Sequence, residues 1–150
     1  MKINQIADLN HYGNDQMNRV YGVDGISPTV MTKTGGGRET KILDDSSFKV
    51  RKLTPKECWK LMGFSGEYFD KAKLAGVSDS QLYKQAGNSI VTYVLYEIYK
   101  ELYKAMPYLF GDVKLSSFFS GIGAFEVALD MLYNYIITGE EQNFIKPQVD

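Results

Sequence analysis

The sequence has few of the residues and patterns that mark several protein classes. Its 150 residues include only one cysteine, Cys58, and one histidine, His11. One cysteine cannot close an intrachain disulfide, which excludes a disulfide-stapled secreted domain and suits a reducing compartment. No apolar run approaches the roughly 20 residues that span a bilayer, and the N-terminus lacks the apolar core of a signal peptide. We therefore expect a cytoplasmic protein.

A strong charge of one sign is also absent, because the net charge is −1. The two parts of the chain differ, since residues 1–60 carry a balance of +3 and residues 61–150 one of −4. A surface that faces phosphates is therefore expected in the first part, although a small excess of charge is also typical of a solvated face. The 44% hydrophobic and 23% charged residues predict a folded domain with a core of its own.

The first third of the sequence is rich in β-formers that are interrupted by turn residues. The pattern predicts short strands at 19–21, 29–34 and 48–53, with a turn at 23–28 and a polar loop at 44–47. A helix is predicted next, because Thr54 can cap it, Pro55 fits its first position and Glu57 completes a capping box. This helix is expected to stop at Gly63, and shorter helices are predicted at 66–75 and 78–85.

The longest periodic stretch runs from residue 89 to residue 105. Apolar residues recur there every four positions and predict one helix with a buried stripe, formed by Ile90, Val94, Ile98 and Leu102 and widened by Val91 and Leu95. A linker is expected at 106–112, a buried strand at 113–119, a helix at 125–137 and a loose polar tail beyond it.

Three strings carry the candidate chemistry. Residues 119–126 read F-S-G-I-G-A-F-E between the predicted strand and helix, where glycines and a helix N-terminus can hold a nucleotide-type cofactor or can form a plain turn. Residues 85–90 read Q-A-G-N-S-I, and Asn88 or Ser89 could cap the following helix or could point into a ligand pocket. Residues 51–64 contain the well-capped helix, which indicates no chemistry by itself.

Taken together, the three strings resemble the cytosine-5 DNA methyltransferases. R-x-L-T-P-x-E-C-x-x-L-x-G-F at 51–64 resembles the ninth conserved motif of that family, Q-A-G-N-S-I the tenth, and F-S-G-I-G-A-F-E the first. The stretch 19–43 also looks like the end of the family's target-recognition region. The resemblance implies an α/β fold, with part of a Rossmann-like methyltransferase sheet and a small β-rich target-recognition remnant. It divides the chain into a target-recognition portion at 1–53, the region of motifs nine and ten at 54–112, the first strand and helix of the cofactor domain at 113–137, and a tail at 138–150.

The resemblance also implies a cofactor and binding residues. The cofactor is S-adenosylmethionine, and the matching positions are Phe119, Gly121, Gly123, Ala124, Asn88 and Ser89. Ala124 stands where the family often has a third glycine, and Gly87 would let its neighbours approach the cofactor. The positions that match DNA-facing ones are Arg19, Thr29, Gln16 and Arg38. Arg38 follows a glycine run at 35–37, for which a flexible hairpin loop is the alternative interpretation. The positions expected to brace the recognition region are Arg51, Thr54, Pro55 and Glu57.

The catalytic residues of the family are missing. Its members flip the target cytosine out of the duplex, and a thiolate from a Pro-Cys-Gln-like loop then attacks the ring while a carboxylate from a Glu-Asn-Val-like strand supports it. Neither string occurs here. Cys58 is interpreted as a small core residue and His11 as a loop residue, and the acidic residue that would hold the ribose has no counterpart. The motif order is also permuted, since the ninth and tenth precede the first.

Three hypotheses follow from the resemblance. The first is a subunit of a split, permuted bacterial or phage methyltransferase that acts on double-stranded DNA with a second chain carrying the catalytic motifs. The second is a non-catalytic regulatory protein that binds DNA or a methyltransferase. The third is an inert truncated product. Because an incomplete sheet leaves an exposed edge, a homo-oligomer is also expected to be possible.

Overall fold

All the strands of the described chain come from its first 52 residues. The computed structural model describes residues 3–32, 38–44, 47–116, 118 and 121–140. β1 (Gln5–Asp8), β2 (Arg19–Tyr21), β3 (Lys41–Asp44) and β4 (Lys49–Lys52) form one sheet in that order. The β2–β3 pair is parallel and the two outer pairs are antiparallel. A single helical turn, α1 (Asp15–Asn18), precedes β2.

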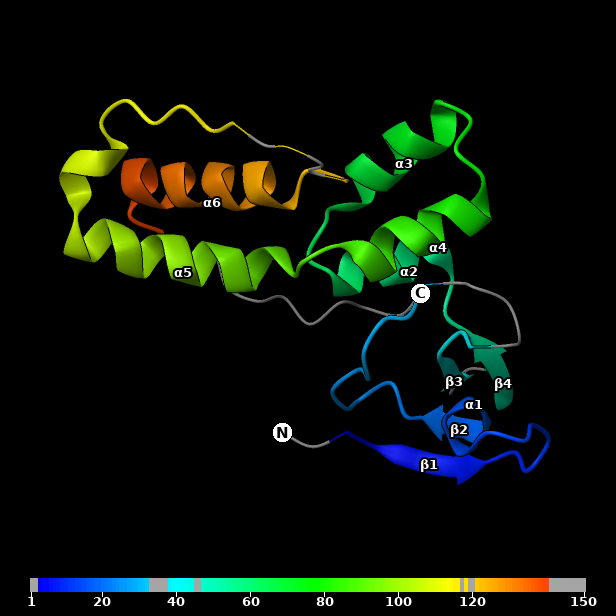
Figure 1. Cartoon of the computed structure of the whole chain (residues 1–150). Helices are drawn as coiled ribbons and strands as arrows, with labels where there is room; N and C mark the ends of the chain where they lie inside the picture. The colour runs from blue at the N-terminus through cyan, green and yellow to red at the C-terminus, as the bar shows by residue number, and fades with distance from the viewer. Residues whose placement is uncertain (1–2, 33–37, 45–46, 117, 119–120, 141–150) are drawn as a thin grey trace.

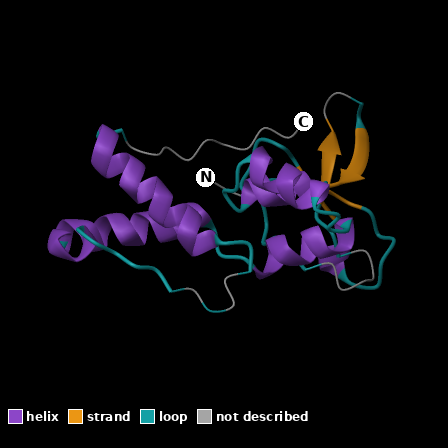
Figure 2. Ribbon diagram, turned by 90° about the horizontal axis from the view of Figure 1, so that it is seen from above, coloured by secondary structure: helices purple, strands orange, loops and turns teal. Residues whose placement is uncertain are grey.

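The rest of the described chain is helical. It contains α2 (Pro55–Leu61), α3 (Gly66–Leu74), α4 (Asp79–Asn88), α5 (Thr92–Ala105), a 3-10 turn η1 (Pro107–Phe110) and α6 (Ala124–Thr138). Figures 1 and 2 show the sheet at one end of the molecule, α2–α4 in the middle and the α5–α6 pair at the other end. No helix among the described residues combines the length and the apolar character that crossing a membrane requires.

The junction between the sheet and the helices is a polar clasp around Glu57. The predicted capping box is confirmed: Thr54 accepts from the Glu57 backbone at 3.2 Å, and the Glu57 carboxylate accepts from the Thr54 backbone at 2.6 Å. Arg51 on β4 donates two hydrogen bonds to the same carboxylate, at 2.9 and 2.8 Å. Burial alone would raise the pKa of Glu57, but the bonds from Arg51 and Thr54 outweigh it, so the pKa lies below its ordinary value. These residues therefore brace the fold, as the sequence predicted.

The lowered pKa of Glu57 predicts a specific loss of stability in acid. The ionised carboxylate stabilises the folded chain above its ordinary pKa of 4.5, and this contribution disappears as pH falls through the lowered folded value. We expect Glu57→Gln to be less stable than the wild type at neutral pH and to show a shallower decline with acid. Urea unfolding at successively lower pH measures both slopes. Equal slopes would mean that Glu57 carries none of this linkage.

A hub of aromatic residues joins α2, α3 and α4. Trp59 is 3% exposed, and its ring lies 5.6 Å from that of Phe64 and 5.8 Å from that of Phe69. Its indole nitrogen donates to the Leu82 carbonyl of α4 at 2.9 Å. The hydroxyl of Tyr83 donates to the Leu53 carbonyl at 2.6 Å, which ties α4 to the end of the sheet. These contacts fix α4 relative to α2 and to the end of the sheet.

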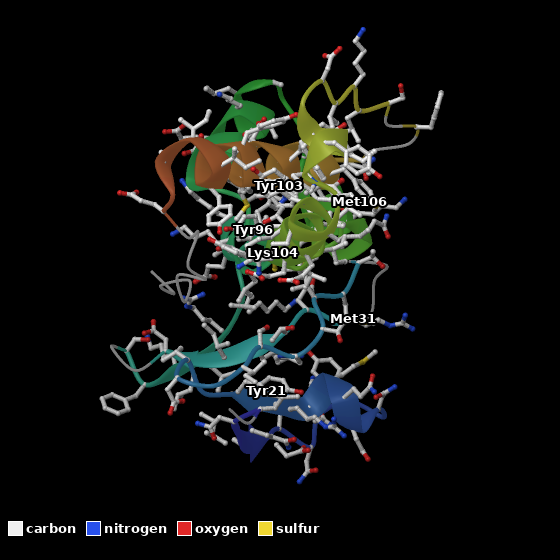
Figure 3. All side chains as sticks on the ribbon, turned by 90° about the vertical axis from the view of Figure 1, so that its left-hand side faces the viewer. Tyr21, Met31, Tyr96, Tyr103, Lys104 and Met106 are labelled. Atoms are coloured by element: carbon white, nitrogen blue, oxygen red, sulfur yellow. The ribbon has the colours of Figure 1, made fainter. Side chains whose placement is uncertain are left out.

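The long helix is confirmed, but most of its predicted apolar stripe is exposed, and only Leu95 of that stripe is fully buried. α5 begins at Thr92, and its buried residues include Thr92, Leu95 and Tyr96. Figure 3 labels Tyr96, whose ring lies 6.5 Å from that of Tyr135 on α6. The four residues expected in the core are 36–56% exposed: Ile90, Val94, Ile98 and Leu102. The prediction failed because α5 is apolar on two faces, and periodicity does not tell which face is covered.

Two predicted strands are also corrected. Residues 113–116 form no strand, Leu115 is 41% exposed and Phe118 is 86% exposed. A buried strand needs neighbours that complete its hydrogen bonds, and the described chain offers it none. Residues 29–32 are likewise outside any strand. The predicted Rossmann-like sheet is therefore not formed by the described residues, which build a mixed α/β structure around a different, four-stranded sheet.

Candidate functional site

The start of α6 meets the end of α4 around one pocket, which we call the α4–α6 pocket. Figure 1 shows that α5 and α6 run in the same direction, so that both helices begin at the end of the pair next to α4. The pocket has a volume of about 550 Å³. Its lining comes from two segments: Val77, Gln81, Lys84, Gln85, Asn88, Ser89 and Ile90, and then Gly121, Ile122, Ala124 and Phe125. Residues more than 30 positions apart in the sequence thus face one cavity.

Four of the six predicted cofactor residues line this pocket: Asn88, Ser89, Gly121 and Ala124. Gly123 lies between two of them as the N-cap of α6, and Phe119 lies outside the described residues. Gly121 and Gly123 have φ values of +63° and +78°, in the left-handed region that glycine adopts without steric cost. The turn is therefore the tight, glycine-dependent one that the string predicted.

Asn88 and Ser89 do not cap the long helix. Asn88 is the last residue of α4, and Ser89 ends that helix through its backbone bond to the Ala86 carbonyl at 3.2 Å. α5 begins later, with Val91 at its N-cap position and no side-chain cap. The alternative interpretation as helix caps is wrong, so both side chains are left at the wall of the pocket.

The sequence analysis missed three polar residues of the pocket. Gln81, Lys84 and Gln85 lie on α4 with Asn88, at the three- and four-residue spacing that puts side chains on one helix face. That polar spacing was the signal that could have identified them. Among the described residues, the buried Oε1 of Gln85 has no hydrogen-bond partner. The first backbone N–H groups of α6 also receive no side-chain cap. The pocket thus offers both an acceptor and donors to a ligand.

The four predicted DNA-facing residues share a second hollow, which we call the α1 cavity. It has a volume of about 500 Å³, and its lining includes Gln16, Arg19, Thr29 and Arg38. The other lining residues are Asn14, Met17, Tyr21, Pro28, Met31, Glu39 and Thr40. Two arginines against one glutamate give this cavity a net positive wall, in the part of the chain where the charge balance predicted it.

The wall of the α1 cavity is fixed from behind by a buried polar network. The Asn18 side chain accepts from the backbones of His11 and Tyr12 at 3.0 and 2.8 Å and donates to the Tyr12 carbonyl at 2.8 Å. Lys41 is 5% exposed, donates to the Met17 carbonyl at 2.6 Å, and lies 4.8 Å from the centre of the Tyr12 ring. Burial, with a smaller contribution from Lys52, lowers the pKa of Lys41. The network holds α1, and with it Gln16, in place.

A third, mostly apolar cavity of about 470 Å³ lies between the sheet and the helices. Thr29 lines both this central cavity and the α1 cavity, and Ser89 lines both it and the α4–α6 pocket. Gly87 is essential here: a Cβ on it would lie 2.5 Å from the Thr32 nitrogen and 2.7 Å from the Met31 carbonyl carbon. Gly87 therefore lets the 31–32 backbone pack directly against α4. The three hollows are therefore neighbours that share lining residues.

The single cysteine of the sequence, Cys58, has an unreactive thiol. Cys58 is 5% exposed in the helix α2, and burial, followed by the charges of Glu57 and Glu39, raises its pKa to about 12. A thiol of that pKa carries almost no thiolate near neutral pH. His11 is an exposed loop residue whose ring packs edge-on against Tyr12. Both interpretations from the sequence are confirmed.

Comparison with known proteins identifies relatives of the chain. The profile of the family "C-5 cytosine-specific DNA methylase" matches residues 2–104. The orphan methyltransferase M.SPBetaI of Bacillus phage SPbeta is 36% identical over 135 residues, covering 60% of this chain and 30% of the relative. The orphan methyltransferase M.Rho11sI of Bacillus phage rho11s is 60% identical over 55 residues, covering 37% of this chain and 11% of the relative. The type II methyltransferase M2.ScrFI of Lactococcus lactis subsp. cremoris is 48% identical over 65 residues, covering 43% and 18%.

The match includes the strings at 51–64 and 85–90 and ends before the string at 119–126. The resemblance of that last string to the first motif stays a prediction. This chain spans at most 30% of the length of these three relatives. The family profile nevertheless covers well over half of the chain. The chain belongs to the C-5 cytosine-specific DNA methylase family.

Proposed function

We propose that this chain is a subunit or fragment of a DNA (cytosine-5)-methyltransferase. It contributes elements that bind S-adenosylmethionine and DNA, and a partner chain contributes the catalytic cysteine. The proposal assigns residues 1–53 to target recognition, 54–112 to the region of motifs nine and ten, 113–137 to the start of the cofactor domain and 138–150 to a tail.

The observation that carries the proposal is the α4–α6 pocket. Asn88 and Ser89 come from one end of α4, while Gly121 and Ala124 come from the turn before α6, and the fold brings all four to the same cavity. The two segments are 31 positions apart at their nearest lining residues, Ile90 and Gly121, so the fold rather than the sequence brings them together. The pocket supports a shared ligand for both strings.

The residues of this pocket fit S-adenosylmethionine, which supplies the methyl group when bound. The cofactor carries an ammonium, a carboxylate and hydroxyls beside apolar surface. The unpartnered Gln85 Oε1 offers an acceptor, the uncapped start of α6 offers backbone donors, and Ile122 and Phe125 offer apolar surface. Asn88 and Ser89 add side-chain polar groups to the same wall. These residues would hold and orient the cofactor.

The DNA-binding part of the proposal rests on the α1 cavity. Arg19 and Arg38 place two guanidinium groups around it, and guanidinium matches the geometry of phosphate oxygens. Gln16 and Thr29 add hydrogen-bonding groups at the same wall. The central cavity shares Thr29 with the α1 cavity and Ser89 with the α4–α6 pocket, so DNA at the one and a cofactor at the other would occupy neighbouring sites.

A partner is part of the proposal because the one cysteine of this sequence is not a reactive thiol. Methylation at carbon 5 in this family needs a thiolate that reaches a flipped base. Cys58 is buried in the core beside Trp59, and its pKa of about 12 keeps it protonated. The reactive cysteine is therefore assigned to another chain.

Co-expression tests the proposal. The chain is produced together with the protein encoded by the adjacent reading frame, provided that this protein carries the Pro-Cys-Gln-like and Glu-Asn-Val-like strings. The expected result is a complex that transfers a labelled methyl group from S-adenosylmethionine to DNA, while neither chain alone does so. An Asn88→Ala variant that folds normally should weaken cofactor binding by the complex. If a complete methyltransferase is encoded beside this chain and never binds it, the proposal fails.

Replacing Cys58 tests whether the catalytic cysteine lies outside this chain. We expect Cys58→Ala to leave methylation by the complex unchanged, because the thiol does not reach substrate. The variant should lose only about 1 kcal/mol of stability, the cost of removing one small buried group. Urea unfolding and the methyl-transfer assay measure the two effects. A folded variant without activity would show that Cys58 is the nucleophile.

A regulatory protein that binds DNA without catalysis is the second candidate. It is favoured by one contrast: the α1 cavity brings Arg19 and Arg38 together, whereas the single thiol, that of Cys58, is buried and its pKa is raised to about 12. Gel-shift assays with the isolated chain, and calorimetry with S-adenosylmethionine, separate the candidates. Tight DNA binding without any partner, sensitive to Arg19→Ala and Arg38→Ala, would favour this second function over the first.

A further inference from the structure

Two buried side-chain oxygens lie where the end of α4 meets the start of α6, and neither has a hydrogen-bond partner among the described residues. One is Oε1 of Gln85, a residue that lines the α4–α6 pocket. The other is Oε2 of Glu126, in the first turn of α6. A buried acceptor without a donor costs free energy, and native structures contain few of them. Both oxygens are therefore positioned to accept hydrogen bonds from a bound molecule.

The Glu126 carboxylate lies against the glycine turn that forms part of the pocket wall. Its Oε2 is 3.5 Å from the position that a Cβ on Gly123 would occupy. Gly123 stands between Ile122 and Ala124, which both line the pocket. Tyr99 on α5 is close enough that the charge of Glu126, after burial, raises its pKa, but the described residues give Oε2 no hydrogen bond from that side. A ligand in the pocket is thus the nearest source of a donor.

The group that suits these two acceptors is an ammonium. In the part of the chain that the structure describes, no group of three or more His, Cys, Asp and Glu side chains is placed to hold a metal ion. One amide oxygen and one carboxylate oxygen suit an ammonium instead, because it brings several N–H donors and a positive charge. The amide of Gln85 accepts one hydrogen bond, and the carboxylate of Glu126 accepts another while balancing the charge.

The same pocket also has groups that favour a carboxylate. Lys84 adds a positive charge to its lining, one position before Gln85 on α4. The start of α6 has no side-chain cap, so its first N–H groups and the positive end of the helix dipole are open to an anion. A molecule that carries an ammonium and a carboxylate on one carbon, which is an α-amino acid, satisfies both kinds of group at once.

We propose that Gln85 and Glu126 form an ammonium-binding wall of the α4–α6 pocket, and that the pocket selects ligands that carry an α-amino-acid group. The carboxylate of that group binds Lys84 and the start of α6. This inference rests on the proposed function, whose cofactor carries such a group, and it adds the two residues that select for it. A molecule with the same nucleoside but without the amino-acid group gains nothing from either residue.

Two adenosine thioethers separate this contact from general binding to the pocket. S-adenosylhomocysteine carries the α-amino-acid group, whereas 5′-methylthioadenosine has the same nucleoside and sulfur without it. Calorimetry measures the affinity of the full chain for each. We expect Gln85→Leu to weaken binding of S-adenosylhomocysteine by about tenfold or more and to leave 5′-methylthioadenosine unaffected, because leucine is similar in size but has no acceptor. Glu126→Gln should follow the same pattern. Gln5→Leu on the exposed strand β1 is the matched control and should change neither affinity.

The pair of ligands also shows how the inference can fail. An equal loss of affinity for both thioethers would mean that Gln85 only supports the shape of the pocket. Unchanged binding of S-adenosylhomocysteine would mean that water satisfies the two oxygens, and the inference would fail while the proposed function stands. The inference also fails if the wild-type chain binds neither thioether, whereas the methyl-transfer assay of the co-expressed complex tests the proposed function separately.

The stability of the variant gives a second check that needs no ligand. Because Gln85→Leu removes a buried acceptor that lacks a donor, the variant should unfold in urea at or above the wild-type midpoint. A lower midpoint would show that Gln85 has a structural partner within the chain, and the ammonium-binding wall would then be wrong.

Discussion

Replacing Trp59 by alanine is expected to remove about 3–5 kcal/mol from the free energy of unfolding, the cost of deleting a large buried aromatic side chain. Trp59 is 3% exposed, its ring contacts those of Phe64 and Phe69, and its nitrogen donates to Leu82 of α4. Since the hub joins three helices, the loss affects the placement of α4 and hence of the α4–α6 pocket. A domain of ordinary stability has only about 5–15 kcal/mol to lose.

Trp59→Phe is the matched control. It keeps an aromatic ring in the hub and removes the hydrogen bond to Leu82, so we expect less than half of the loss caused by alanine. Urea unfolding followed by far-ultraviolet circular dichroism is the suitable measurement, because Trp59 is the only tryptophan and its fluorescence disappears in both variants. If Trp59→Ala unfolds at the wild-type urea concentration, the hub does not hold the helices together.

The clasp around Glu57 illustrates which parts of this fold the sequence predicts well. The helix that begins after Thr54 and ends near Gly63 is signalled by local chemistry: a capping residue, a proline at the first position and a glycine at the end. Such signals act within a few residues and do not depend on the rest of the fold. The short strand β2 at Arg19–Tyr21 and the helix α3 were also predicted, and α4, expected at 78–85, is found at Asp79–Asn88.

The errors occur where a distant partner decides the structure. Residues 113–116 have the composition of a buried strand, but a strand forms only with a neighbour, and the described chain supplies none there. The periodicity of a core face is found at Ile90, Val94, Ile98 and Leu102, but these side chains are 36–56% exposed in the described structure. β1 was not predicted, although it pairs with β2, because all four of its residues are exposed and lack a clear alternation. In each case the missing information is what lies opposite the segment.

The candidate site was predicted in the same uneven way. The α1 cavity gathers all four residues expected to face DNA, and the α4–α6 pocket gathers four of the six expected to face the cofactor. The family resemblance identified those positions. It did not identify Gln85 and its neighbours on α4, whose role depends on which face of the helix the start of α6 meets. Only the packing of α6 beside α5 and α4 makes those side chains part of a pocket.

Gly87 on α4 packs against the backbone of residues 31–32 beside the α1 cavity. Adding one methyl group to Gly87 should push that backbone away from α4. A Cβ at this position would lie 2.5 to 2.9 Å from backbone atoms of Met31 and Thr32, which cannot rotate away as a side chain can. We expect Gly87→Ala to cost about 1–3 kcal/mol, the range for overpacking. Because Met31 and Thr29 line the α1 cavity, the displaced segment should also weaken DNA binding by about tenfold, equivalent to roughly 1.4 kcal/mol.

Whether Gly87→Ala raises or lowers the stability of the chain distinguishes two explanations. Gly87 lies inside α4, where alanine is ordinarily better than glycine by about 1 kcal/mol. Helix propensity alone therefore predicts that Gly87→Ala stabilises the chain, whereas contact with the 31–32 backbone predicts the opposite. Gly111→Ala is the control, because the nearest atom to its added Cβ is 3.9 Å away. Thermal unfolding and a gel shift with duplex DNA, on the chain or its complex, measure both consequences. A more stable Gly87→Ala with unchanged DNA binding would mean that α4 and the recognition segment are not in contact, and would separate the proposed DNA surface from the proposed cofactor pocket.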